Sequence, residues 1–323
     1  MVIITKTPLR IPFAGGLTDL KRYASRFGAA TCSVTIDRYL YVVAKENAED
    51  LIDLRYRDVH ERVTKYSDLK HDLTREVIRF TGLEDRPLEI HLLADLQGES
   101  GLGSSGALTV GLLNALHTLQ GRTRSPEQLA SEASHIEIDV LGGACGFHDP
   151  AICAFGGLNL IEYDRDGVTK RRADVSPERL QVFEDNLLVF YTAIHSQTNP
   201  SLHLLESGME GALDTLHEMK ELAYAMYEAL AAGNADEAGR VLQANQDCKI
   251  RLPGNFRSPF VDDVMKRAEE NDLLVQIPGG KVGGYLLVYC PTEKHKVAAR
   301  EIYGSFREVD LAFDRQGPAV SVV

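Results

Sequence analysis

The run of glycine and serine at residues 96–107, LQGESGLGSSGA, constrains the fold more than any other part of the sequence. Residues 88–95, which precede it, alternate apolar and polar side chains as a strand does. Residues 105–120, which follow it, repeat apolar side chains at helical spacing, with Ala107, Val110 and Leu113 on one face. The run therefore connects a strand to a helix.

A glycine-rich turn that ends at a helix N-terminus can bind a phosphate, because unpaired backbone N–H groups and the positive end of the helix dipole meet there. The run has neither the lysine of GxxxxGK[ST] nor the spacing of GxGxxG followed by an acidic residue. Gly101, Gly103 and Gly106 would let the backbone approach the ligand. Ser104 and Ser105 would add hydroxyls, one of which could reach a phosphate-bound Mg²⁺. A serine N-cap after a flexible turn is the alternative reading.

A second glycine-rich stretch, residues 135–157, carries two acidic side chains of interest and reads HIEIDVLGGACGFHDPAICAFGG. Asp149 stands at the head of a short helix predicted over 146–155, where the helix dipole favours an ionised carboxylate. Glu137 lies on a helix predicted over 126–140. With a serine, phosphates and water it would supply the hard oxygen ligands that Mg²⁺ prefers. An N-cap at Asp149 and a solvated helix residue at Glu137 are the alternatives.

The N-terminal stretch TPLRIPFAGGLTDL, residues 7–20, places a cation in an apolar strand. A strand-borne Arg10 must find an anionic partner or reach the surface. Asp19 follows a glycine turn and could bind sugar hydroxyls. A surface arginine and an Asx-type turn explain the same residues without a ligand.

The apolar patterns of the remaining chain predict strands and helices in two lobes, with a boundary near residue 180, so that the units are 1–180 and 181–323. Strands are predicted within 35–66, which reads as an antiparallel sheet, and over 156–164, 186–192, 273–277, 284–290 and 308–314. Helices are predicted over 203–232, 235–247 and 259–270, and a last helix precedes residue 308.

The composition argues against several classes of partner. The chain has 323 residues, a net charge of −12 and a pI near 5.3, so its average surface repels nucleic acid and anionic lipid. Its five cysteines form no CxxC pair, which favours reduced thiols. The sequence shows neither a secretion signal nor a long apolar span, and we expect a cytoplasmic protein without a membrane partner. The sequence does not indicate an oligomeric state.

Four motifs in this order resemble the GHMP kinases, the superfamily of galactokinase, homoserine kinase and mevalonate kinase. They are PLRIPFAGGLTDL, GESGLGSSGALTVGLLNAL, IEIDVLGGACGFHDPAICAFGGLN and VQIPGGKVGGYLLVYC, and they span nearly the whole chain. The first and third motifs are most like those of the D-glycero-α-D-manno-heptose 7-phosphate kinases.

This resemblance implies an α+β fold of two domains, the first related to ribosomal protein S5 domain 2 and the second ferredoxin-like, with the active site in the cleft between them. It implies an ATP- and Mg²⁺-dependent sugar kinase that phosphorylates the anomeric hydroxyl of a small-molecule acceptor, a heptose 7-phosphate. The implied catalytic residues are Asp149, which orients or deprotonates the sugar hydroxyl, and Arg10, which faces it and the transferring phosphoryl group. The other implied roles are ATP phosphates for Gly101, Leu102, Gly103, Ser104, Ser105 and Gly106, Mg²⁺ for Ser105 and Glu137, and the sugar for Gly16, Thr18, Asp19 and His148.

The sequence departs from the motifs of the heptose kinases at positions that bear on specificity. GGKVGG stands for the usual GAGGGG, so Lys281 and Val282 replace glycines beside the expected phosphate site. GFHDP stands for GKQDQ, which puts His148 before the catalytic aspartate. His195 or Ser196 replaces an arginine that could hold a distal phosphate, and an unphosphorylated sugar is therefore an alternative acceptor.

Two further alternatives belong to other functional classes. One is a sugar-responsive regulatory protein that kept the fold and lost catalysis, and it would bind ATP without turnover. The other is a decarboxylase of the same fold that acts on a phosphorylated mevalonate, and it would release CO₂.

Overall fold

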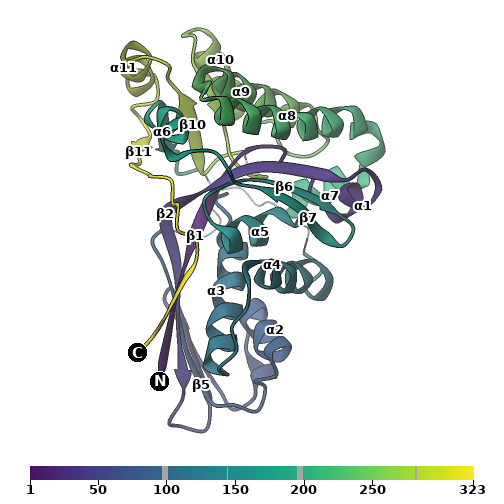
Figure 1. Ribbon diagram of the computed structural model, residues 1–323, viewed down its shortest axis with the longest axis vertical. Coiled ribbons are helices and arrows are strands. Elements are labelled where there is room, and N and C mark those ends of the chain that lie inside the picture. Colours follow the sequence, from purple (N-terminus) through teal and green to yellow (C-terminus); the bar gives the residue numbers. More distant parts are fainter. Residues whose placement is uncertain (97–100, 144, 195–198, 281) are drawn as a thin grey trace.

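The helices and strands of the computed structural model form two β-sheets with helices packed against them (Figure 1). The structure describes residues 1–96, 101–143, 145–194, 199–280 and 282–323. The α+β class expected from the sequence is confirmed. Within these described residues, no helix combines the length and the apolar character that crossing a membrane requires.

The larger sheet is built on two long antiparallel strands, β1 and β2. Its eight strands follow the order β12-β1-β2-β5-β3-β4, with β6 paired to β2 and β7 paired to β6. One end of β2 pairs with β5 and the other end with β6. The register between β1 and β2 shifts on either side of Arg10, between Pro8 and Arg10 and between Pro12 and Ala14. Such irregularities bend a strand and re-aim its side chains.

The strands of the larger sheet are β1 Val2–Ala14, β2 Ala29–Glu46, β3 Ile52–Tyr56, β4 Val59–Val63, β5 Leu88–Ala94, β6 Leu158–Asp164, β7 Gly167–Arg172 and β12 Ala319–Val322. The strands of the smaller sheet are β8 Leu187–Tyr191, β9 Leu274–Gln276, β10 Tyr285–Tyr289 and β11 Arg307–Glu308. The α-helices are α1 Lys21–Phe27, α2 Asp72–Thr81, α3 Ser104–Leu119, α4 Pro126–Ser134, α5 His148–Phe155, α6 Pro177–Asp185, α7 Asn199–Ser207, α8 Leu213–Ala232, α9 Ala235–Arg251, α10 Pro259–Glu269 and α11 Glu293–Ile302. Three short helical segments are η1 Tyr66–Asp68, η2 His135–Val140, which is π-helical, and η3 Met209–Ala212.

Two groups of helices cover different parts of the larger sheet. The apolar helix α3 packs against β1 and β2, and α2, α4 and α5 pack around it. α8 packs against β1, β2 and β6, and α9 lies beside α8 (Figure 1). Both groups therefore approach β1, which carries Arg10.

The smaller sheet joins the two halves of the chain, because its alternate side chains enter different cores. Val189, Leu287 and Tyr289 belong to the large core that contains β1, β2, α3 and α8. Phe190 and Val288 face the second core, which α10 and α11 complete. The strands run antiparallel in the order β11-β8-β10-β9.

The C-terminal residues return to the larger sheet, where β12 pairs with β1. The division of the chain into 1–180 and 181–323 stays a prediction, and residue 180 lies within α6.

Three predicted elements differ from the structure. The helix predicted over 203–232 is divided into the end of α7, the short segment η3 and α8. The helix predicted over 126–140 is α-helical to Ser134 and continues as the π-helical η2. The strand predicted over 308–314 is confirmed only at Glu308, the end of β11, and at Phe313, which forms an isolated antiparallel bridge with Ile36. Other contacts replace a continuous ladder. Val309 N donates to Val189 O, Ala312 N to Asp37 Oδ1 and Phe313 N to Glu184 Oε1.

Candidate active site

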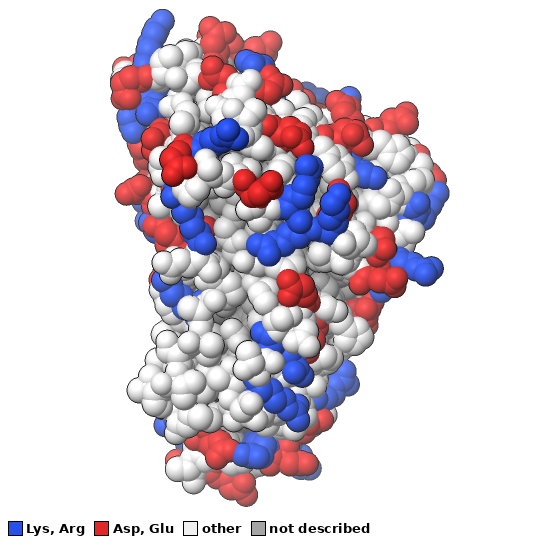
Figure 2. All heavy atoms as spheres, in the orientation of Figure 1, with Lys and Arg blue, Asp and Glu red and all other residues white. Residues whose placement is uncertain are grey.

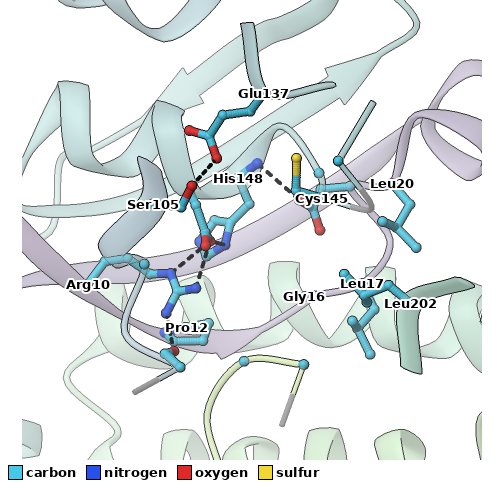
Figure 3. Close-up of a pocket in the computed structure, with 18 of the residues that line it drawn as sticks. Arg10, Pro12, Gly16, Leu17, Leu20, Ser105, Glu137, Cys145, His148 and Leu202 are labelled. Carbon is cyan, nitrogen blue, oxygen red and sulfur yellow. Dashed lines mark hydrogen bonds and ion pairs between the residues drawn. The ribbon is translucent and has the colours of Figure 1, made fainter. Parts of the chain in front are cut away.

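A cavity of about 700 Å³ lies between the two groups of helices. β1 contributes Arg10 to it, the start of α3 contributes Ser105, η2 contributes Glu137, and α5 contributes His148 and Asp149. Figure 3 shows Arg10, Ser105, Glu137 and His148 turned toward a common centre. Three motifs that are far apart in the sequence therefore meet at one cavity.

The centre of the site is an ion pair between Arg10 and Asp149. Arg10 Nε and Nη2 donate to Asp149 Oδ1 at 2.9 and 2.7 Å. Arg10 Nη1 donates to Gly101 O at 2.6 Å, so the same guanidinium also holds the glycine loop. Burial raises the pKa of Asp149, but Arg10 and His148 outweigh this effect and hold that pKa well below its usual range. Asp149 is therefore ionised at neutral pH.

His148 fixes Asp149 from the other side. Its Nδ1 lies 3.0 Å from Asp149 Oδ1, and its Nε2 lies 2.5 Å from Ser33 Oγ. A carboxylate can only accept, so Nδ1 carries the proton in this contact. All the described donors to the Asp149 side chain thus meet Oδ1, and no described residue donates to Oδ2.

Asp19 is a second carboxylate of the cavity wall, buried beside the first. Its Oδ2 accepts a hydrogen bond from His148 N at 3.0 Å. Burial raises the pKa of Asp19. A Cβ on Gly146 would lie 1.9 Å from Asp19 Oδ2, so only glycine leaves room for this carboxylate.

A hydroxyl and carboxylate cluster lies at the start of α3. Ser105 Oγ donates to Glu137 Oε2 at 2.6 Å, and Thr109 Oγ1 donates to Oε1 at 2.6 Å. Burial raises the pKa of Glu137 to about 7 despite these two hydrogen bonds. Ser104 Oγ is buried without a partner among the described residues. A carboxylate with adjacent hydroxyls is the hard oxygen donor set that Mg²⁺ takes, so Ser105 and Glu137 fit that ion.

The described part of the glycine loop is hydrogen-bonded to β1 and packs closely against α5. Gly101 and Gly103 have positive φ angles of 83° and 78°, which glycine adopts without strain. Arg10 N donates to Leu102 O at 3.0 Å. A Cβ on Gly106 would lie 2.6 Å from the carbonyl carbon of Asp149, so glycine lets the N-termini of α3 and α5 approach each other. Residues 97–100 of the loop lie outside the described residues.

Most of the sequence-predicted site residues line the cavity, namely Arg10, Gly16, Asp19, Gly101, Gly103, Ser104, Ser105, Glu137, His148 and Asp149. Leu102, Gly106 and Thr18 are buried and are not among its lining residues. The hydroxyl of Thr18 donates to Gly15 O at 2.7 Å and lies 3.2 Å from Ala30 O, so it shapes the turn before Asp19. Lys281, His195 and Ser196 lie outside the described residues.

Sequence reasoning missed four residues of the site. Thr109 was detectable, because it follows Ser105 by four residues on a helix and therefore shares its face. Asn245 and Lys249 come from α9 and Gln276 from β9, and all three line the cavity. The sequence does not single them out, because α9 carries polar residues along most of its length, Gln243, Gln246 and Asp247 among them.

Comparisons with known proteins show what this chain is similar to. The family model of the GHMP kinases N terminal domain matches residues 70–157. A D-glycero-α-D-manno-heptose 7-phosphate kinase of Campylobacter jejuni is 24% identical, over 98% of this chain and 97% of its own length. A mevalonate kinase of Methanothermobacter thermautotrophicus is 32% identical, over 57% of this chain and 69% of its own length.

Solved structures share the fold over nearly the full chain. A crystal structure of a D-glycero-D-manno-heptose 1-phosphate kinase from Bacteroides thetaiotaomicron matches with a TM-score of 0.82 and 22% identity, covering 99% of each chain. A crystal structure of a mevalonate kinase matches with a TM-score of 0.72 and 17% identity, covering 97% of this chain and 99% of the other.

Proposed function

This chain belongs to the GHMP kinase family, and from that premise we propose that it transfers the γ-phosphoryl group of ATP to the anomeric hydroxyl of a heptose 7-phosphate. The family makes the chain a phosphotransferase, and GHMP kinases are generally ATP-dependent. The acceptor, the anomeric position and the individual residue roles are the proposal.

The observation that carries the proposal is the asymmetric environment of Asp149. Arg10 and His148 hold Oδ1, while Oδ2 has no donor among the described residues. An ionised carboxylate held on one side can accept a hydroxyl hydrogen on the other. Since the carboxylate stands beside the glycine loop at the start of α3, a hydroxyl bound to Oδ2 would face the terminal phosphate.

The transfer itself asks little covalent chemistry of the protein. A bond forms between the sugar oxygen and the γ-phosphorus as the bond from that phosphorus to the β,γ-bridging oxygen breaks. Because its pKa is low, Asp149 is a weak base, so we assign it to orienting the hydroxyl and taking its proton late in the transfer. Arg10 would neutralise charge that develops on the phosphoryl oxygens. The glycine loop, residues 101–106, would bind the ATP phosphates.

Ser105 and Glu137 would hold Mg²⁺, which when bound supplies positive charge to the nucleotide phosphates. The hydrogen bond from Ser105 to Glu137 places the two oxygen ligands side by side. Burial raises the pKa of Glu137 to about 7, and a cation bound beside this carboxylate would favour its ionised form.

The sugar would lie against Gly16 and Asp19, with Asp19 accepting from its hydroxyls. We assign His148 to the orientation of Asp149 as well as to the sugar, because its ring bridges Asp149 and Ser33. One relative supports a sugar, since a heptose 7-phosphate kinase matches nearly the whole chain.

The test is ADP release from Mg-ATP with a panel of acceptors. The panel contains D-glycero-D-manno-heptose 7-phosphate, sedoheptulose 7-phosphate, mannose, galactose, fucose and mevalonate. We expect the highest kcat/KM with the heptose 7-phosphate. Preference for mevalonate or release of CO₂ would overturn the sugar assignment, and nucleotide binding without any turnover would favour a regulatory role.

A further inference from the structure

One side of the cavity is apolar and has no part in the mechanism above. Its apolar lining comes from the segment between β1 and α1, from α7 and from α8, and consists of Leu17, Leu20, Leu202 and Met219. Leu17, Leu20 and Leu202 lie on one side of the cavity in Figure 3, away from Arg10 and Ser105. Apolar surface in a cavity wall favours the apolar groups of a ligand, because their contact removes both from water.

Leu17 occupies a backbone position that suits glycine. Thr18 N donates to Gly15 O at 3.3 Å, so residues 15–18 form a β-turn with Leu17 as its third residue. The φ angle of Leu17 is 74°, in the left-handed region. A positive φ at the third position of a turn favours glycine or asparagine, because the Cβ of other residues crowds the backbone. The turn therefore carries a leucine at a cost in free energy.

The surroundings of the turn maintain this strained conformation. Gly15 N donates to Asn245 Oδ1 at 3.1 Å, and Thr18 Oγ1 donates to Gly15 O at 2.7 Å. These contacts hold the backbone on both sides of Leu17 and do not involve its side chain. Backbone strain that is maintained in this way is concentrated at functional sites.

The other non-glycine residues with a positive φ lie away from the cavity. In the described part of the chain they are Arg57, Ala193 and Asp272, which are exposed and are not among the residues that line the cavity. Leu17 is partly buried and does line it. Its packing on the core is incomplete, so part of the side chain is available to a ligand.

The same segment also brings a carboxylate to the cavity. Asp19 follows Leu17 by two residues, and its Oδ2 accepts from His148 N at 3.0 Å. A carboxylate has lone pairs for several hydrogen bonds, so Asp19 can also accept from a ligand. The segment therefore presents an apolar side chain and a hydrogen-bond acceptor together. A sugar ring complements both, because its edge carries hydroxyls and its faces carry C–H groups.

We propose that Leu17 packs against the C–H face of the acceptor sugar and is a specificity-determining residue of the site. The inference rests on the proposed function, which places the sugar against Gly16 and Asp19. Ser105, in the first turn of the helix that would receive the ATP phosphates, lies on the other side of the cavity (Figure 3). The nucleotide would therefore not contact Leu17.

The experiment separates the apolar contact from the backbone conformation. Leu17→Asn has nearly the shape of leucine and tolerates a positive φ but is polar, whereas Leu17→Met stays apolar. Calorimetry at several temperatures would measure binding of the panel sugar that wild type binds most tightly, and of a non-hydrolysable ATP analogue with Mg²⁺. Leu17→Gly and Arg57→Gly form a second pair. Both remove a side chain at a positive φ, but Arg57, with a φ of 51°, lies in the exposed turn between β3 and β4.

We expect Leu17→Asn to weaken sugar binding about tenfold, the effect of losing one apolar contact, and to make the heat-capacity change of binding less negative. Leu17→Met should bind the sugar within about threefold of wild type, because apolar side chains of similar volume replace each other well. Leu17→Gly should also lose sugar affinity. Its melting temperature should not fall, because relief of the positive φ offsets the lost packing. Arg57→Gly should leave sugar binding unchanged, and no variant should alter binding of the ATP analogue.

Several results would overturn the inference. Equal sugar affinities of Leu17→Asn and Leu17→Met would exclude an apolar contact, and weaker binding of the ATP analogue would assign Leu17 to the nucleotide. A lower melting temperature of Leu17→Gly with unchanged sugar affinity would make Leu17 structural, and failure of wild type to bind any sugar of the panel would remove the ligand. Because calorimetry needs no turnover, a sugar bound through Leu17 without turnover would support the inference and reject the kinase proposal. Turnover that does not depend on Leu17 would reject the inference alone.

Discussion

At the scale of single residues, the site depends on how Asp149 is held. One of its oxygens takes every described hydrogen bond, from a guanidinium and an imidazole, and the other has no donor among the described residues. This arrangement separates the structural role of the carboxylate from the chemical role proposed for it. Residue substitutions can test the two roles separately.

Asp149→Asn should abolish most of the turnover while the nucleotide still binds. The amide keeps the shape of the side chain but cannot accept a proton at the position of Oδ2. We expect kcat to fall by about 10³-fold, within the range for removal of a general base. Rapid quenching would measure ADP formation, and calorimetry with a non-hydrolysable ATP analogue would measure binding. Turnover within a few-fold of wild type would exclude Asp149 from the chemistry.

The lowered pKa of Asp149 also predicts that the stability of the protein depends on pH. The pKa of Asp149 is lower in the folded protein than in the unfolded chain, so its ionised form contributes stability above the unfolded pKa of about 4 and loses it as the pH falls below that value. The free energies of unfolding in urea of wild type and Asp149→Asn should therefore differ at pH 7, and the difference should begin to narrow below about pH 4 and shrink further as the pH falls toward the folded pKa. A difference that stays constant across this range would contradict the ion pair.

His148 should act as a positioning residue whose removal lowers kcat more than it raises the acceptor KM. His148→Leu removes the contact to Asp149 Oδ1 and leaves Ser33 without its partner. We expect kcat to fall about tenfold, the effect of misplacing a catalytic group. His148→Gln, which can still donate to the carboxylate, should recover part of the rate. If His148 acts only on the sugar, both variants would change KM and leave kcat unaltered.

At the scale of elements, the N-termini of the two helices α3 and α5 and the strand β1 meet at glycine positions. Gly106 at the beginning of α3 touches the backbone of Asp149 and Pro150 at the beginning of α5, and Gly103 touches Arg10 of β1. Backbone cannot move aside as a flexible side chain can. The distance between the glycine loop and Asp149 is therefore set by the absence of a Cβ.

Gly106→Ala tests this packing. A Cβ at this position would lie 2.6 Å from the Asp149 carbonyl carbon, so α5 must shift. We expect a loss of about 2 kcal/mol of stability from overpacking, with at least a tenfold loss of kcat/KM. Gly211→Ala is the control, because a Cβ there meets nothing within 4 Å. Thermal unfolding and ADP release would measure both, and equal behaviour of the two variants would refute the packing argument.

The local motifs made much of the site predictable from sequence. Arg10, Ser105, Glu137 and Asp149 each lie in a short stretch with its own periodicity and turn residues, and the structure brings all four together. Lys249 and Gln276 could not be found in this way, because their place at the cavity depends on how α9 and β9 pack against β1. Residues 308–314 have a strand-like pattern because Leu311 and Phe313 pack on the core. The side chains of Asp37 and Glu184 nevertheless accept from the N–H groups of Ala312 and Phe313.

At the scale of the whole molecule, the cavity lies where the two halves of the chain share one core. The smaller sheet sends alternate side chains into the core of the larger one, so the walls of the cavity are joined by packing.

Figure 2 shows acidic and basic side chains interspersed over much of one face, with few of them at lower left, where Figure 1 places β12 and the chain ends. Along β12, Val320 and Val322 are exposed.

The pairing of β12 with β1 predicts the effect of a truncation. Deleting residues 318–323 removes the strand that covers the edge of β1, including the two hydrogen bonds between Val2 and Val323. Unpaired edges favour association with other chains. We expect a lower melting temperature and concentration-dependent aggregation, measured by calorimetry and light scattering. An unchanged melting temperature would show that the pairing of β12 with β1 does not contribute to stability.

The measurement that tests the central claim most directly is ³¹P NMR of the wild-type protein with Mg-ATP and D-glycero-D-manno-heptose 7-phosphate. The account predicts consumption of the ATP γ-phosphate and a new phosphomonoester signal that couples to the anomeric proton, while the original phosphate signal of the sugar persists. A new phosphoester on any other carbon, or ATP that remains unchanged over many hours, would contradict it.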